Sequence, residues 1–188
     1  GAKSLEKFHA RAKLLTEPGA LPYLSAPVVL PKSQVEFFFD IEVDPLRDLT
    51  YLHGIVERRD GDNMTERFLA FFAEEENEAA ERSAFAQSVA FLTSEPSATI
   101  WYYSRYERTI YRKLQIRYPD VCTVEVIEEL FNPTRSVDLY SDVVAKATEW
   151  PTNDQSIKSL AKYLGFNWRD TNPSGAASIQ WFDQWVTT

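Results

Sequence analysis

The feature that most constrains the fold of this chain is an apolar stretch at residues 35–43, with the sequence VEFFFDIEV. Aromatic and β-branched residues favour strands, and a mostly apolar strand is typical of a sheet that is covered on both faces. Residues two apart in a strand point to the same face. The acidic residues Asp40 and Glu42 therefore share one face with Phe38, and the remaining aromatic residues point to the other.

The elements expected after this strand indicate a mixed α/β fold. Turn signals at residues 44–48 and 59–63 separate it from two more β-rich segments, which predicts a three-stranded antiparallel meander. The following residues show mainly helical spacing, and the glutamates at 74–81 are expected to form a solvated helix start. The further expected strands are 50–58, 66–73, 97–103 and 137–139. The expected helices are 74–94, 105–118, 121–131 and 176–185, with a fifth that ends near residue 147 and a sixth that is capped by Asp154 or Ser156 and ends at residue 164. This order predicts helices packed on a central sheet.

We expect one domain preceded by an arm, because 188 residues suit a single domain. The arm comprises residues 1–34, where a short helix at 4–15 is followed by prolines that break regular structure. The domain comprises residues 35–188.

Composition excludes several kinds of site. Cys122 is the only cysteine, so the chain forms no internal disulfide and no cysteine-rich zinc site, and two histidines exclude a three-histidine metal site. The net charge of −8 argues against loose binding to polyanions. An acidic centre neutralised by metal would still be compatible with a nucleic-acid enzyme. The sequence shows no signal peptide and no membrane span, so we expect a cytoplasmic protein with no membrane partner.

The two acids on the apolar strand point to metal binding. Desolvation and mutual repulsion both raise the pKa of neighbouring carboxyl groups unless a cation is present. Mg²⁺ and Mn²⁺ prefer oxygen ligands and suit such a pair. The alternative is that Asp40 and Glu42 lie in solvent at a strand end.

Asp40-x-Glu42 at the end of the first strand, followed by a meander, resembles the first motif of the DEDD 3′–5′ exonucleases, which have a ribonuclease H-like fold. The resemblance continues along residues 35–185. WYYSRYE at 101–107 resembles the second motif of the family, and SVDL at 136–139 resembles its downstream Asp-Leu segment. SIKSLAKYLG at 156–165 and GAASIQWF at 175–182 resemble consecutive segments of the YprB-type domain of predicted RecB-like nucleases. The resemblance implies a mixed sheet in which the antiparallel meander joins parallel strands.

The resemblance also implies phosphodiester hydrolysis with two Mg²⁺ or Mn²⁺ ions. Asp40 would bridge both ions, Glu42 would hold the ion that activates water, and Glu107 would be the ligand from the second motif, where most of the superfamily has aspartate. Asp138 would be a more distant ligand, or else a helix cap. The fourth carboxylate of the subgroup has no match before residue 188, so we expect the domain to be truncated before its last motif.

The substrate strand would need cations and stacking surfaces near these acids. Arg105, Arg108 and Arg112 are spaced to share one helix face and would hold phosphates, and Lys158 belongs to a second, weaker basic cluster. Tyr103 and Tyr106, together with Tyr102, would stack bases, although at least one of the three is expected in the core. The alternative for both basic clusters is a solvated helix face.

We therefore predict that the intact protein is a metal-dependent exonuclease acting on single-stranded DNA or RNA, with this chain as one domain of a longer nuclease. A second interpretation is a catalytically incomplete domain that binds nucleic acid or serves as a scaffold. A third is a protein-interaction module that uses the arm and the C-terminal tryptophans.

Overall fold

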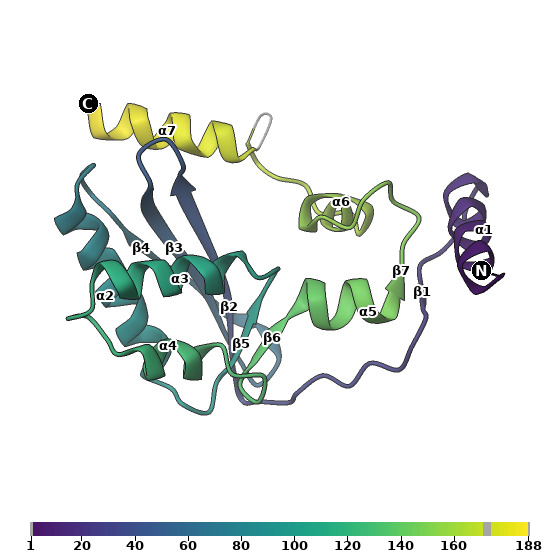
Figure 1. Cartoon of the computed structure of the whole chain (residues 1–188), viewed down its shortest axis with the longest axis horizontal. Helices are drawn as coiled ribbons and strands as arrows, with labels where there is room; N and C mark the ends of the chain where they lie inside the picture. Colours follow the sequence, from purple (N-terminus) through teal and green to yellow (C-terminus); the bar gives the residue numbers. More distant parts are fainter. Residues whose placement is uncertain (1, 171–173, 188) are drawn as a thin grey trace. The chain divides into compact units, whose positions relative to one another are not determined.

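The computed structural model describes residues 2–170 and 174–187, with the side chains of residues 2–4 and 7 also left undescribed (Figure 1). The chain divides into two compact units. One contains residues 1–30 and 139–169, and the other contains residues 31–138 and 170–188. The expected limits of the ribonuclease H-like domain, 35–188, stay a prediction.

The larger unit is built on a five-stranded mixed sheet, as predicted. Its strands lie in the order β4 (Asp62–Phe72), β3 (Leu49–Arg59), β2 (Val35–Asp44), β5 (Thr99–Tyr102) and β6 (Ser136–Asp138). Strands β2, β3 and β4 form the antiparallel meander, and β5 and β6 extend the sheet parallel to β2. The central strand β2 thus joins the antiparallel and parallel halves.

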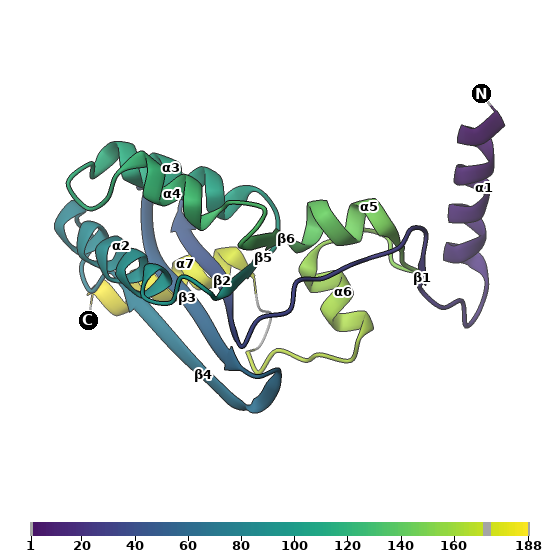
Figure 2. The same cartoon turned by 90° about the horizontal axis from the view of Figure 1, so that it is seen from below.

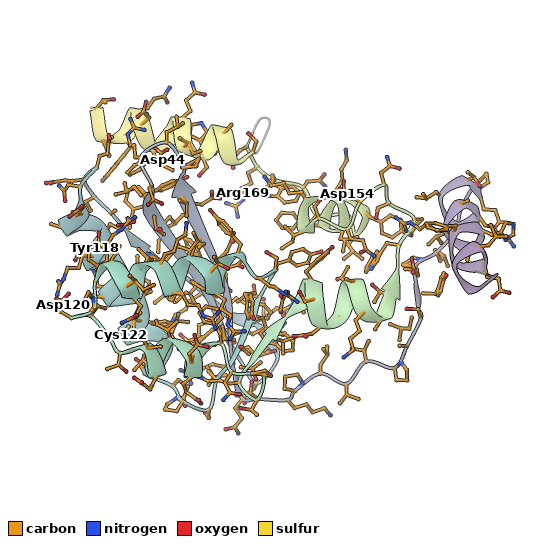
Figure 3. All side chains as sticks on the ribbon, in the orientation of Figure 1. Asp44, Tyr118, Asp120, Cys122, Asp154 and Arg169 are labelled. Carbon is orange, nitrogen blue, oxygen red and sulfur yellow. The ribbon has the colours of Figure 1, made fainter. Side chains whose placement is uncertain are left out.

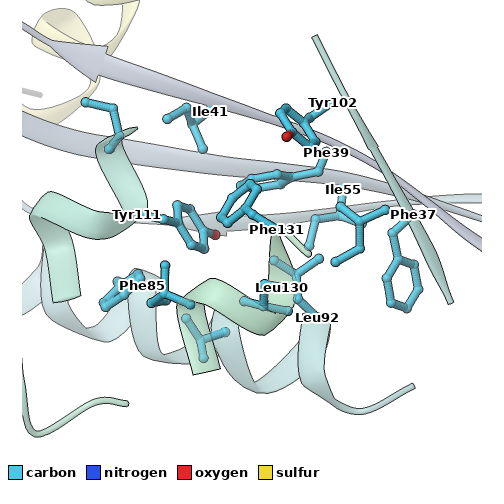
Figure 4. Packing of buried hydrophobic residues seen from close by; sticks show 14 of the residues in the cluster. Phe37, Phe39, Ile41, Ile55, Phe85, Leu92, Tyr102, Tyr111, Leu130 and Phe131 are labelled. Carbon is cyan, nitrogen blue, oxygen red and sulfur yellow. The ribbon is translucent and has the colours of Figure 1, made fainter. Parts of the chain in front are cut away.

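Helices α2 (Glu78–Thr93), α3 (Tyr106–Arg117) and α4 (Val124–Leu130) cover one face of this sheet (Figures 1 and 2). Asn77 caps α2 by accepting a hydrogen bond from the backbone N–H of Ala80 at 2.9 Å. Phe37 and Phe39 of β2 enter the core below these helices, where Phe39 meets Tyr111 of α3 edge to face (Figure 4).

The opposite face of the sheet is only partly covered, whereas the sequence predicted that both faces of the sheet would be covered. Asp40 is exposed on it, and Phe68 of β4 retains 65% of its exposure. Helix α7 (Gly175–Thr187) packs at one end of the strands, where Phe182 stacks on Tyr51 with ring centroids 4.4 Å apart. The β2 strand therefore has one buried face and one accessible face.

Arg47 ties this end of the sheet together. It follows β2 and forms ion pairs with Asp44, Glu76 and Asp183 of α7, the one to Asp44 at 2.5 Å (Figure 3 labels Asp44). Asp183 is the only acid after Asp170 in the sequence. Because Asp183 pairs with Arg47, its carboxylate serves to attach α7.

Glu81 in α2 is fully buried, whereas the acidic start of this helix was expected to be solvated. Its carboxylate accepts hydrogen bonds from the backbone N–H of Thr50 at 2.6 Å, the Tyr118 hydroxyl at 2.6 Å and the Arg117 guanidinium at 2.7 Å. These donors compensate for the loss of water around a buried charge. The sequence expectation failed because all three donors come from other elements.

The smaller unit joins the N-terminal segment to residues 139–169. Its elements are α1 (Ala2–Thr16), β1 (Tyr23–Leu24), the π-helix η1 (Leu139–Val144), α5 (Ala145–Ala147), β7 (Thr148–Glu149) and α6 (Ile157–Tyr163). Strand β1 pairs antiparallel with β7, and Arg11 of α1 donates hydrogen bonds to the carbonyl oxygens of Trp150 and Thr152. Of the two expected caps, Ser156 caps α6.

Candidate carboxylate site

The two acids of strand β2, Asp40 and Glu42, lie on the face opposite its buried side chains, as the alternation along the strand predicted. Phe37, Phe39 and Ile41 are buried with 1%, 3% and 5% of their surface exposed. On the other face Asp40 is exposed and Glu42 is half-buried. The apolar side chains fix the direction of the strand, and this fixes the side on which the carboxylates lie.

Parallel pairing brings two further acids to the same region of the sheet. Phe38 of β2 pairs with Trp101 of β5, and Tyr102 pairs with Asp138, the last residue of β6. The chain leaves β5 after Tyr102 and enters α3, whose first turn contains Glu107. Asp138 therefore lies at the end of β6 and Glu107 lies beyond the end of β5, and both of these strands run parallel to β2.

The turn between β5 and α3 is held by Asp138. The backbone N–H of Ser104 donates a hydrogen bond to Asp138 Oδ1 at 2.9 Å. Ser104 has a φ of 95°, in the left-handed region that side-chain-bearing residues rarely adopt. Sequence reasoning missed Ser104, whose only signal was a polar residue between a strand and a helix. The strained turn sets where α3 starts, and so where Glu107 lies.

Glu107 is the most perturbed acid of the site. It is 3% exposed, and its Oε2 atom has no hydrogen-bond partner among the described residues. Burial, with smaller contributions from the charges of Asp40 and Asp138, raises the pKa of Glu107 to about 8, while backbone hydrogen bonds oppose the shift. The three carboxyl groups therefore lie close enough to influence one another.

The carboxylate oxygens of Asp40, Glu107 and Asp138 are suitable ligands for a divalent cation, but these side chains do not converge on one point. Among residues 2–170 and 174–187, no group of three or more His, Cys, Asp or Glu side chains is arranged to hold a metal ion. The buried, unpaired oxygen of Glu107 is nevertheless the kind of acceptor that a hard cation satisfies, and Asp40 and Asp138 supply further carboxylates. Binding would require these side chains to move toward a common point.

The three tyrosines expected at the site take different positions. Tyr106 is 50% exposed, and its pKa is raised by burial and then by the charges of Glu42 and Glu107, which places it beside these acids. Tyr103 is half-buried. Tyr102 packs in the core against Phe131 with ring centroids 5.3 Å apart. Tyr106 is thus the tyrosine with the most surface available to a ligand.

The arginines of α3 are engaged with a neighbouring helix. Arg108 and Arg112 both form ion pairs with Glu128 of α4, at 3.0 and 2.6 Å. Hydrogen bonds from Arg112 and Arg108 lower the pKa of Glu128 to about 2. Arg105 is exposed, and Lys158 is an exposed residue of α6 in the smaller unit. The phosphate-binding roles of these four residues stay predictions.

His53 belongs to the core. It is fully buried, and its Nδ1 lies 3.1 Å from the Tyr111 hydroxyl, which in turn lies 2.8 Å from Ser88 Oγ. Burial lowers the pKa of His53 to about 3. The imidazole is therefore neutral and acts as a packing group.

A comparison with known families agrees with the mixed α/β sheet described above. A family model of the RNase H superfamily matches residues 37–188. The chain belongs to the RNase H superfamily. Searches of curated proteins and of solved structures find no match. The five-stranded mixed sheet, with helices on one face, is consistent with a ribonuclease H-like fold. No helix within the described part of the chain is long and apolar enough to cross a membrane.

Proposed function

We propose that this RNase H superfamily member is a metal-dependent nuclease domain that hydrolyses phosphodiester bonds of single-stranded nucleic acid as a 3′–5′ exonuclease of the DEDD, YprB-type kind. The observation that carries the proposal is the buried oxygen of Glu107, which lacks a hydrogen-bond partner and lies within the influence of Asp40 and Asp138. A carboxyl group in such surroundings is stabilised by a cation. The cytoplasmic location stays a prediction.

Asp40, Glu42, Glu107 and Asp138 would hold the Mg²⁺ or Mn²⁺ ions. Two such ions supply an activated water and a stabilised leaving oxygen. Asp40 is exposed and can meet the substrate, while Asp138 also keeps the turn at Ser104 in place. Tyr106, half-exposed beside Glu42 and Glu107, is suited to contact the substrate next to the reacting phosphate.

The test is hydrolysis of end-labelled single-stranded DNA and RNA with Mg²⁺ or Mn²⁺. We expect Asp40→Ala and Glu42→Ala each to remove most of the activity, and shortening from the 3′ end to identify the polarity. Glu66→Gln, which changes an exposed acid on β4, is the matched control and should leave the rate unchanged. Undiminished hydrolysis by the Asp40→Ala, Glu42→Ala double variant would eliminate the mechanism.

A second candidate is a catalytically incomplete domain that binds nucleic acid. It is favoured by Asp183, which pairs with Arg47 and so is not available as a fourth ligand. Salt-sensitive binding of oligonucleotides without cleavage in Mn²⁺ would support this candidate. Cleavage that depends on Asp40 would exclude it.

A further inference from the structure

The accessible face of the sheet carries an aromatic residue close to Asp40. Strand pairing aligns Asp40 of β2 with Gly54 of β3 and Gly54 with Ala70 of β4. Residues that pair directly lie on the same face. Asp40 therefore begins a row whose next two members have little or no side chain, and this row runs toward the edge of the sheet.

The neighbouring row on this face is apolar and ends in Phe68. Phe38 of β2 pairs with Val56 of β3, which pairs with Phe68 of β4. Trp101 of β5 continues the row, with its ring stacked at 6.3 Å from that of Phe38. Phe68 retains 65% of its exposure although it belongs to this row.

The ring of Phe68 leans over Gly54 toward Asp40. A Cβ built on Gly54 would lie 3.4 Å from Phe68 Cε2, 3.7 Å from Phe68 Cζ and 3.8 Å from the backbone oxygen of Asp40. The absence of a side chain at Gly54 thus allows the ring to approach the residue that is paired with Asp40. One part of the ring contacts the sheet, and much of the rest is exposed to solvent.

We infer that Phe68 is a positioning residue on which a nucleobase of the substrate stacks while its phosphate lies at the carboxylates. The inference rests on the proposed function, and it adds Phe68 as a residue that contacts the substrate of that nuclease. Every base has a flat π face, so an exposed aromatic ring binds single strands with little regard to sequence. Arg58, on the same face and 4.8 Å from the centre of the Phe38 ring, supplies a cation, although it also pairs with Glu36 at 2.8 Å. A duplex would keep its bases paired, so the occupant is single-stranded.

Binding of the full chain to a fluorescent oligothymidylate tests this, with Ca²⁺ in place of the activating ion. We expect Phe68→Leu to weaken binding about 5- to 20-fold, because leucine covers Gly54 but offers no ring. Phe68→Tyr should bind within about twofold of the wild type, and Phe68→Met repeats the test with a second ring-free side chain. An abasic oligomer of the same length should bind all variants alike.

Met64→Ala is the control, because Met64 is 91% exposed on the same strand and should not affect binding. Equal binding of oligothymidylate by the wild type, Phe68→Leu and Phe68→Met overturns the inference, as does an equal loss on the abasic oligomer. If Asp40→Ala still abolishes hydrolysis in that case, the proposed function stands without it. Absence of both binding and hydrolysis in the wild type overturns both.

Discussion

Replacing Glu107 with glutamine should change how the stability of the protein depends on pH. The carboxyl group of Glu107 is buried, and its pKa is raised from 4.5 to about 8. The folded protein therefore holds a proton between these two pH values that the unfolded chain releases. Stability from this group is fully present below pH 4.5 and is lost as the pH rises through about 8.

The size of the effect follows from the shift. Each pKa unit corresponds to about 1.4 kcal/mol, so a shift of this size makes the wild type lose at most roughly 5 kcal/mol between acid and alkaline pH. Glutamine has the same shape and stays neutral. Glu107→Gln should therefore match the wild type near pH 4 and exceed its stability by up to roughly 5 kcal/mol at pH 9.

Urea unfolding in EDTA at a series of pH values measures this difference. EDTA is needed because a bound cation would stabilise the ionised form of Glu107 and reverse the comparison. Glu66→Gln, on the exposed side of β4, should follow the wild-type profile throughout. Parallel profiles for Glu107→Gln and the wild type would refute the argument that Glu107 is buried and protonated.

Three further substitutions test the fold around the site by urea unfolding. Phe182→Ala removes the ring stacked on Tyr51 and should cost about 3–5 kcal/mol, and a cost under about 1 kcal/mol would contradict the packing of α7. Glu81→Ala removes the acceptor of the Thr50 N–H and the Tyr118 hydroxyl and one partner of Arg117, and should cost about 3–5 kcal/mol. Glu78→Ala, exposed in the same turn, should stay within about 0.5 kcal/mol. Ser104→Val should cost about 1–3 kcal/mol, whereas Ser104→Gly should be neutral or stabilising, because glycine adopts the φ of 95° without strain. A glycine variant less stable than the valine variant would argue against the strained turn.

The central part of this fold could be predicted because its signals are local. The alternation along residues 35–43 determines which side chains enter the core, so it also predicted that Asp40 and Glu42 would lie on the opposite face. The turns between the first three strands were equally visible as glycine, proline and aspartate clusters. The order of strands and helices then indicated the mixed sheet that the structure describes.

The features that escaped prediction depend on partners far away in the sequence. Glu81 looked like one more acid at a helix start, and only its donors from β3 and α3 explain its burial. Arg108 and Arg112 looked available for phosphates, but Glu128 of α4 pairs with both. The pairing of β1 with β7 joins segments more than a hundred residues apart, which no local pattern encodes.

Strand β4 lies at one edge of the sheet, and its helix-facing side carries a charged residue that forms an ion pair with the neighbouring strand. Arg67 on this strand forms an ion pair with Glu57 of β3 at 2.5 Å, and Glu57 itself is only 3% exposed. A strand of another molecule that hydrogen-bonded to β4 would lie next to this ion pair. Natural sheets use inward-pointing charges on edge strands to discourage such additions, so the Arg67–Glu57 pair would disfavour hydrogen bonding between β4 and a strand of another molecule.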